Sequence, residues 1–379
     1  MCGIIAVLGR KSRRAPPASE GLLALLSAAE RELNQSSETE HLNAAANALG
    51  RLDRELRGTP GLWTMLNDDA LVESLLTSTG RMQERVAELE RAQDRDASID
   101  VEQRNAALVR MRDGLWAIQR DRTAHAKAVR ALAGGHVPHQ SAAAAFSSLQ
   151  TALAALDRLE VRGRDSAGLS VLVSGVDVDD PKLQRLLATR TNDELFRNAS
   201  ARSANGSLNF VYKHAAEIGE LGDNVAALRA TITADELLQS SLRTSEVRTL
   251  VLGHTRWASV GIISQANAHP LNQEEIEGPN GPYVIGALNG DVDNHHELIE
   301  QNGLRISDAI STDAKVIPVL VSREMEAGYG LCDAFRRSVG AFEGSVAIGA
   351  ASTANPDQLA LALRGSGQAL YVGLAEDMF

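Results

Sequence analysis

Cysteine, aromatic residues and long hydrophobic runs are all scarce in this sequence of 379 residues. Its two cysteines are too few for a disulfide framework or a cysteine-rich metal site. No apolar stretch reaches the roughly 18 residues that a membrane helix needs. The first apolar run is followed at once by Arg10, Lys11, Arg13 and Arg14, which is not the pattern of a secretory signal peptide. We therefore expect a cytoplasmic protein without a membrane partner, in a reducing compartment that keeps its cysteines as thiols.

Basic residues are also in the minority. The chain has 38 Lys and Arg against 49 Asp and Glu, which gives a net charge of −11 and a pI near 5.4. Because a nucleic-acid partner requires a basic face for its phosphates, we expect none. Hydrophobic residues make up 44% of the chain but aromatic residues only 3%, so Ala and Leu supply most of the core. No cofactor and no metal ion are expected.

The chain divides into three zones by its residue pattern. The apolar run from residue 3 to residue 8 predicts a buried strand. From residue 19 to residue 159, apolar side chains such as Met82, Val86 and Leu89 recur at spacings of three and four, which predicts four or five amphipathic helices. Breaks are expected at residues 58–61 and 134–138. The charged faces of these helices are either a solvated surface or a surface that binds a partner.

The third zone, from residue 161 onward, contains short β-rich runs separated by Gly and Asn. They predict a strand-rich α+β domain to which the opening strand also belongs. The sequence thus indicates one domain made of residues 1–15 and 150–379, with residues 16–149 inserted as a helical bundle. The predicted strands are residues 168–173, 249–253, 283–288, 345–350, 359–363 and 369–374, and the predicted helices of this zone are residues 224–242 and 312–327.

Cys2 directly follows the initiator methionine and precedes the first predicted strand. If Met1 is removed, Cys2 carries a free α-amine with a pKa near 8 beside a thiol with a pKa near 8.5. The amine can then accept the thiol proton, which is the arrangement of an N-terminal nucleophile. The alternative is that Cys2 is a small buried hydrophobe in a terminal strand.

Four segments of the third zone carry residues suited to amide hydrolysis by a thiol. They are LEVRGRDSAGLSV from residue 159, GHTRWASVG with NAHP from residues 253 and 267, ALNGDVDNHHEL from residue 287, and STDAKVIPVLV from residue 311. Asn289 and Gly290 could donate hydrogen bonds to an oxyanion. Arg256 could bind a carboxylate through two hydrogen bonds, with Ser259 beside it, and Asp313 could bind an ammonium group.

Each of these residues also has a structural interpretation. Arg256 could form a buried ion pair, and Asn289 with Gly290 could form a type I′ turn. Asp313 could cap a helix. His269, directly before Pro270, is more often structural than catalytic.

Taken together, these motifs resemble the class II glutamine amidotransferases, and within them the glutaminase domain of the glucosamine-6-phosphate synthases (glutamine–fructose-6-phosphate aminotransferases). The resemblance rests on MCGI at the start, RG-DSAG from residue 162, GHTRWA, NAHP, NG…NH from residue 289, TD…VI from residue 312, and the closing strands with ALRGSGQALYVGLAEDMF. It covers residues 1–10 and about 150–379. It implies an α+β fold, the N-terminal nucleophile αββα sandwich, with the helical bundle inserted.

The resemblance also implies roles for the matching residues. Cys2 is the nucleophile, its α-amine the general base, and Asn289 with Gly290 the oxyanion hole. Arg256 and Ser259 bind the glutamine α-carboxylate, and Asp313 binds the α-ammonium. The remaining residues of the implied site are Trp257 in the loop that closes over glutamine, Arg162 and Gly163 beside the cysteine, and His269 as a support of the site.

The implied partners are glutamine, a sugar isomerase domain or subunit that binds a ketose phosphate, and further copies of the chain in a homo-oligomer. The implied product is ammonia for conversion of fructose 6-phosphate to glucosamine 6-phosphate. The sequence departs from the family in its long helical region, in Val260, and in ending at GLAEDMF, where the family's glutaminase domain has further strands. These departures predict either a fragment or a chain completed by another one. They also leave open a glutamine-sensing or scaffold module, or a different N-terminal nucleophile hydrolase.

Overall fold

The computed structural model describes residues 2–93, 101–190, 193–215, 220–276, 281–365 and 367–374. It separates into two compact units, one formed by residues 1–10 and 144–373 and the other mainly by residues 11–143. Within the described residues, no helix is long and apolar enough to cross a membrane. The mixture of helices and antiparallel sheets confirms the α+β class expected from the sequence.

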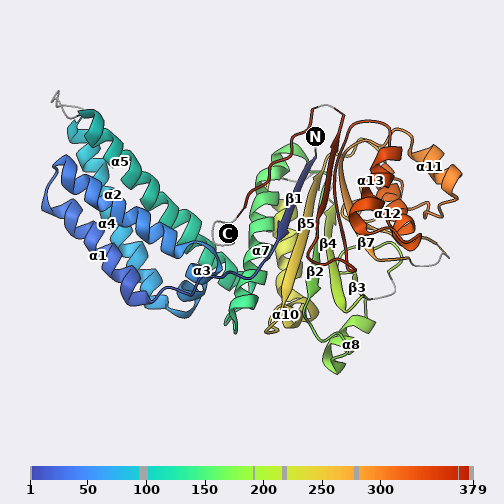
Figure 1. The fold of residues 1–379 in the computed structure, drawn as a ribbon, viewed down its shortest axis with the longest axis horizontal. Helices are drawn as coiled ribbons and strands as arrows, with labels where there is room; N and C mark the ends of the chain where they lie inside the picture. The colour runs from blue at the N-terminus through green and yellow to red at the C-terminus, as the bar shows by residue number, and fades with distance from the viewer. Residues whose placement is uncertain are drawn as a thin grey trace. The chain divides into compact units, whose positions relative to one another are not determined.

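The first unit contains two antiparallel sheets (Figure 1). The five-stranded sheet has the order β1-β5-β2-β4-β3, and the four-stranded sheet the order β6-β7-β8-β9. The strands are β1 (Gly3–Leu8), β2 (Ser166–Ser174), β3 (Ala201–Ala204), β4 (Ser207–Ala215), β5 (Arg248–Arg256), β6 (Leu271–Asn272), β7 (Val284–Gly290), β8 (Val346–Ser352) and β9 (Ala360–Arg364).

Apolar side chains from both sheets meet in one core cluster. Leu172, Leu252 and Ile285 are buried in it, and Ile4 and Ala6 of β1 pack against it. Because side chains alternate between the two faces of a strand, Ile5 lies on the other face, where a Cβ on Gly253 would contact both Ile5 and the helix residue Leu156. The opening strand is therefore held by packing on both of its faces.

Helices cover the outer face of each sheet in this unit (Figure 1). α7 and α9 pack on the five-stranded sheet, and α12 and α13 on the four-stranded one, where they bury a second apolar cluster. The helices of this unit are α7 (Gln140–Leu159), η2 (Glu160–Arg162), α8 (Pro181–Ala188), α9 (Asp223–Ala234), α10 (Glu236–Ser241), α11 (His295–Asn302), η3 (Asp313–Lys315), α12 (Val316–Glu326) and α13 (Leu331–Ala341).

The regular elements of the second unit, within its described residues, are all helices. Its elements are α1 (Ser19–Gln35), α2 (Thr39–Leu56), α3 (Gly58–Asn67), α4 (Asp69–Gln93), α5 (Val101–Trp116), the π-helix η1 (Ala117–Thr123) and α6 (Ala124–Leu132). The predicted apolar stripe of Met82, Val86 and Leu89 is buried in it. In the π-helical turn, Arg122 donates to Asp53 at 2.9 Å, so the wider turn contributes an ion pair to the bundle.

The structure differs from the sequence prediction at several elements. The predicted helix 224–242 is two helices, because the Asp235 side chain accepts from the Leu238 amide and starts a new one. The break predicted at residues 58–61 lies one residue earlier: Arg57 is extended between α2 and α3, and Gly58 already begins α3. Residues 369–374 are not a strand; they pair with no described strand. β3, β4 and the two-residue β6 were not predicted.

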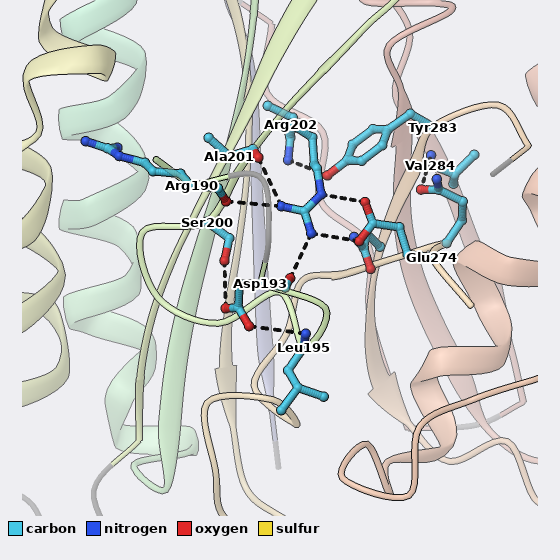
Figure 2. A network of polar contacts seen from close by, with 12 residues as sticks. Arg190, Asp193, Leu195, Ser200, Ala201, Arg202, Glu274, Tyr283 and Val284 are labelled. Carbon is cyan, nitrogen blue, oxygen red and sulfur yellow. Dashed lines mark hydrogen bonds and ion pairs between the residues drawn. The ribbon is translucent and has the colours of Figure 1, made fainter. Parts of the chain in front are cut away.

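A polar network holds the segment before β3 to the four-stranded sheet (Figure 2). The Arg202 guanidinium forms two hydrogen bonds with the Glu274 carboxylate, at 2.5 and 2.8 Å, and a third with the Asp193 carbonyl at 2.8 Å. The Asp193 carboxylate accepts from the Ser200 hydroxyl at 2.9 Å. The network thereby fixes the loop that places Phe196 in the core between the sheets.

Candidate functional site

The pairing of β1 with β5 sets the position of Cys2. Gly3 lies opposite Thr255, so the residue before β1 lies beside the end of β5. The Trp257 amide donates to Cys2 Sγ at 3.3 Å, and the thiol donates to the Trp257 carbonyl at 3.5 Å. The backbone of one residue thus contacts the sulfur through both its N–H donor and its carbonyl acceptor.

The environment of the Cys2 thiol acts on its pKa in both directions. Burial raises the pKa, and the nearby Asp291 carboxylate adds to the rise. The hydrogen bond from the Trp257 amide and the positive charge of Arg256 oppose it, because both favour the thiolate. The net pKa is raised, so the thiol needs a base to become a nucleophile.

Arg256 is the last residue of β5, and only 3% of its surface is exposed. Its guanidinium donates to the carbonyl oxygens of Ile262, at 3.1 Å, and of Val260. The loop after Trp257 therefore folds around the cation. Burial lowers the pKa of Arg256, while the charges of Cys2, Asp313 and Asp165 oppose that shift.

Asp313 begins η3 and is 4% exposed. Its carboxylate accepts from the Val292 amide at 2.7 Å and from the Thr312 hydroxyl at 3.3 Å. Burial raises its pKa, and the Val292 hydrogen bond counters the rise. The charges of both Asp313 and Cys2 act on the buried Arg256 guanidinium and oppose the fall in its pKa.

Asn289 and Gly290 form the end of β7, opposite Ala347 and Val346 of β8, rather than an isolated hairpin turn. Both are partly buried. Gly290 has φ 127°, and a Cβ there would lie 1.8 Å from the Ser345 carbonyl oxygen. Only glycine fits this position, because both the positive φ and the close approach exclude a side chain.

His269 lies inside the unit, against Thr312 and the ring of His254. Its Nε2 is 3.3 Å from the Thr312 hydroxyl, and its Nδ1 accepts from the Leu288 amide at 3.3 Å. The two imidazole centroids are 4.4 Å apart. Burial lowers the pKa of His269 well below its usual value, and that of His254 to about 3. His269 therefore links the ends of β7 and η3 as a neutral ring.

The segment around Gly163 lies directly against the Trp257 peptide. A Cβ on Gly163 would lie 2.6 Å from the Arg256 carbonyl carbon and 2.7 Å from the Trp257 nitrogen. Glu160, just before it, is buried and accepts from the amides of Gly222 and Val225 at the start of α9, at 2.6 and 2.9 Å. The Arg162 side chain is exposed, as is that of Trp257, at 60%.

Two acidic residues that the sequence analysis did not select also border the site. Asp165 accepts from the Ala258 amide at 2.7 Å and so holds the residue after Trp257. Asp291 accepts from the Ser259 hydroxyl at 2.7 Å. Both acids lie in motifs that the sequence analysis used, Asp165 in RG-DSAG and Asp291 directly after Asn289-Gly290. An acidic side chain within such a motif was the sequence signal that could have identified them. Within the described parts of the chain, no group of three His, Cys, Asp or Glu side chains could hold a metal ion.

The sequence is similar to curated glutamine–fructose-6-phosphate aminotransferases (isomerizing), and no family model matches it. It is 29% identical to the enzyme of Acidithiobacillus ferridurans over 228 residues, and 29% identical to that of Pseudomonas putida over 223 residues. Each alignment covers 59% of this chain and 28% of the relative. The Salmonella typhi enzyme is 34% identical over 127 residues, 33% of this chain and 20% of the relative. The chain thus spans 28% or less of the length of these relatives.

Two solved structures overlap with part of the chain. One is a glutamine phosphoribosylpyrophosphate amidotransferase from B. subtilis, with a TM-score of 0.27 and 17% identity over 49% of this chain and 35% of the other. The second is described as the allosteric regulatory enzyme of purine biosynthesis, with a TM-score of 0.30 and 18% identity over 52% of this chain and 37% of the other.

Proposed function

We propose that this chain is the glutamine-hydrolysing part of a glutamine amidotransferase of the glutamine–fructose-6-phosphate aminotransferase type. The observation that carries the proposal is the setting of Cys2. Its sulfur accepts a hydrogen bond from Trp257, and the buried Arg256 and Asp313 supply one charge for each end of an α-amino acid. The similarity to the curated aminotransferases supports the same assignment.

In the proposed reaction, removal of Met1 frees the α-amine of Cys2, which takes the thiol proton. The sulfur bonds to the side-chain carbonyl carbon of glutamine, and the carbonyl oxygen becomes an oxyanion. When the intermediate collapses, the carbon–nitrogen bond breaks, and the nitrogen leaves as ammonia with the proton that the amine held. Water then cleaves the thioester, which releases glutamate and restores the thiol.

Arg256 would bind the glutamine α-carboxylate, with Ser259 beside it, and Asp313 the α-ammonium. Asn289 and the Gly290 amide would donate to the oxyanion, where removal of one donor typically slows catalysis by about 10²–10³-fold. Trp257 would close over bound glutamine. His269, Gly163 and Arg162 would hold the surrounding backbone. His269 lies against Thr312, and Gly163 lies against the Arg256–Trp257 peptide group.

The two packed sheets with helices on both outer faces support assignment to the N-terminal nucleophile sandwich. We propose that residues 1–15 and 150–379 form this glutaminase domain and that residues 16–149 are a helical insertion. The ammonia would serve the conversion of fructose 6-phosphate to glucosamine 6-phosphate in a sugar isomerase domain or subunit, within a cytoplasmic homo-oligomer. The alternative is a glutamine-sensing or scaffold module, favoured by the size of the helical unit.

Intact mass spectrometry tests the proposal. Purified chain is weighed before and after incubation with 6-diazo-5-oxo-norleucine, a glutamine-like electrophile, and Cys2→Ala is treated in the same way. A starting mass without Met1 and one adduct that is absent from Cys2→Ala are expected. Retained Met1, or no adduct on chain that iodoacetamide still labels at Cys2, would contradict the catalytic assignment. If glutamine still protects that chain against thermal unfolding, the sensing module becomes the better assignment.

A further inference from the structure

We propose that Asp291 is a second binding residue for the substrate ammonium, so that the site holds this cation between two carboxylates, Asp291 and Asp313. The inference rests on the proposed function, because it extends the recognition of glutamine at the same site. Neither the sequence motifs nor the similarity to known enzymes assigns a role to Asp291.

The backbone places the two carboxylates on one short segment. The Asp291 amide donates to the Ser345 carbonyl at 3.0 Å, which fixes the segment that follows β7. The next amide, that of Val292, donates to the Asp313 carboxylate at 2.7 Å. The amide of the residue that follows Asp291 therefore holds the Asp313 carboxylate.

The Asp291 side chain faces the site rather than the outer helices. It accepts from the hydroxyl of Ser259 at 2.7 Å, in the loop that folds around Arg256. Its negative charge also acts on both the Cys2 thiol and the Asp313 carboxyl. The Asp291 carboxylate therefore faces the loop around Arg256, and the residue that follows it binds Asp313 through its amide.

The charges of the site favour this interpretation over a purely structural one. Two neighbouring carboxylates repel each other, and that arrangement is relieved when a cation binds between them. Arg256 donates to the loop carbonyls and is assigned to the substrate carboxylate, so the substrate ammonium is the cation that this reaction supplies to the two acids. In this arrangement the Ser259 hydroxyl orients the Asp291 carboxylate while it remains beside the carboxylate site proposed for Arg256.

Calorimetry on the full chain with Cys2→Ala, which cannot turn substrate over, separates this role from catalysis. L-glutamine is compared with glutaramate, which has the same amide and carboxylate but no α-ammonium. We expect Asp291→Asn to raise the Kd for L-glutamine about tenfold, because a charge-assisted contact is lost, and to leave the Kd for glutaramate unchanged. Asp313→Asn should act in the same direction.

Asp293→Asn is the matched control, since Asp293 is an exposed acid two residues further along the same segment. It should leave both affinities unchanged. An unchanged Kd for L-glutamine in Asp291→Asn, or equal weakening of glutamine and glutaramate, would overturn the inference. Failure of the proposed function has a different signature: L-glutamine binds, and Asp291→Asn weakens it, but Cys2 of the wild-type chain is not labelled by 6-diazo-5-oxo-norleucine. If L-glutamine does not bind at all, both proposals are wrong.

Discussion

The Trp257 amide donates a hydrogen bond to the Cys2 sulfur at 3.3 Å, across 255 positions of sequence. This contact exists because β1 pairs with β5 in a register that places Gly3 opposite Thr255. The Trp257 carbonyl, which accepts from the thiol, shares its peptide group with the Ala258 amide, and Asp165 accepts from that amide at 2.7 Å. The proposed nucleophile is thus positioned by backbone and carboxylate contacts formed before any substrate is bound.

The proposed oxyanion hole gives the first prediction. Asn289→Ala should lower kcat for glutamine hydrolysis by about 10²–10³-fold with little change in KM, because the lost hydrogen bond forms in the transition state. Steady-state release of glutamate and ammonia measures both constants. Cys2 labelling by iodoacetamide serves as the control and should be unaffected. A large rise in KM with an unchanged kcat would assign Asn289 to ground-state binding.

Gly163 gives a prediction about packing beside the nucleophile. Gly163→Ala should distort the Trp257 peptide and lower stability, because the new Cβ would lie 2.6 Å from the Arg256 carbonyl carbon. The cost should be about 1–3 kcal/mol in urea unfolding. Gly340→Ala in α13 is the matched control: nothing lies within 4 Å of its Cβ, and alanine is the better helix former. Equal stability of the two variants would show that the Trp257 peptide can move without cost.

The buried His254 predicts loss of stability in acid. Its pKa is about 3 in the folded chain, because burial disfavours the charged ring, whereas it is about 6.5 in an unfolded chain. Between these values the unfolded state binds the proton and the folded state does not. This ring should therefore lower stability by about 1.4 kcal/mol per pH unit as the pH drops below 6.5, and the buried His269 ring adds to the fall in the same direction.

Urea unfolding at pH 7, 6 and 5 measures this slope, with His254→Asn as the comparison. The variant should lose less stability than the wild type over this range, even if it is less stable at pH 7. If stability changes with pH equally in the two chains, the prediction is wrong, because the His254 pKa would then be the same in the folded and unfolded states.

Lys213 predicts a gain of stability on substitution. Its amine is fully buried, has no hydrogen-bond partner among the described residues, and lies 5.3 Å from the Phe196 ring centroid. Burial, together with the charge of Lys315, lowers its pKa well below the usual value. Lys213→Met should stabilise the protein at pH 7 by about 1–3 kcal/mol, the usual cost of an unsatisfied buried polar group.

The lowered pKa of Lys213 also predicts how the stability of the protein changes with pH. Because the unfolded chain binds this proton up to a pH near 10.5 and the folded chain releases it earlier, wild-type stability should rise between pH 7 and 9. That rise should be smaller in Lys213→Met. Urea midpoints at the two pH values measure it, and an equal rise in both chains would show that Lys213 keeps its proton when folded.

The sequence was most informative where a motif coincides with a regular element. The apolar run after Cys2 and the run at residues 249–253, which leads into GHTRWA, both form strands as predicted, β1 and β5, because their apolar side chains are buried in the core between the sheets. The β3–β4 hairpin was missed, although Asn205-Gly206 between apolar residues is a recognised hairpin signal. Residues 369–374 were predicted as a strand from composition alone, but a strand also needs a partner, which composition does not specify.

The contacts of the candidate site were harder to predict than its residues. That Asp313 accepts from the Val292 amide depends on how η3 packs against the segment after β7, which no local pattern encodes. The position of Asp291 beside Ser259 depends on the folding of the loop around Arg256. Motifs therefore identify the residues of the candidate site, whereas tertiary packing determines which carboxylate accepts a hydrogen bond from which amide or hydroxyl.

The buried carboxylate of Glu160 has a mechanical consequence. It bonds to the two amides at the start of α9, while Gly163, three residues along the chain, abuts the peptide that contacts Cys2. These contacts connect the turn at residues 220–222, through η2, to the peptide group that donates to the sulfur. Tension applied at that turn, for example by a binding partner or a chemical crosslink, would be transmitted to the peptide that positions the nucleophile.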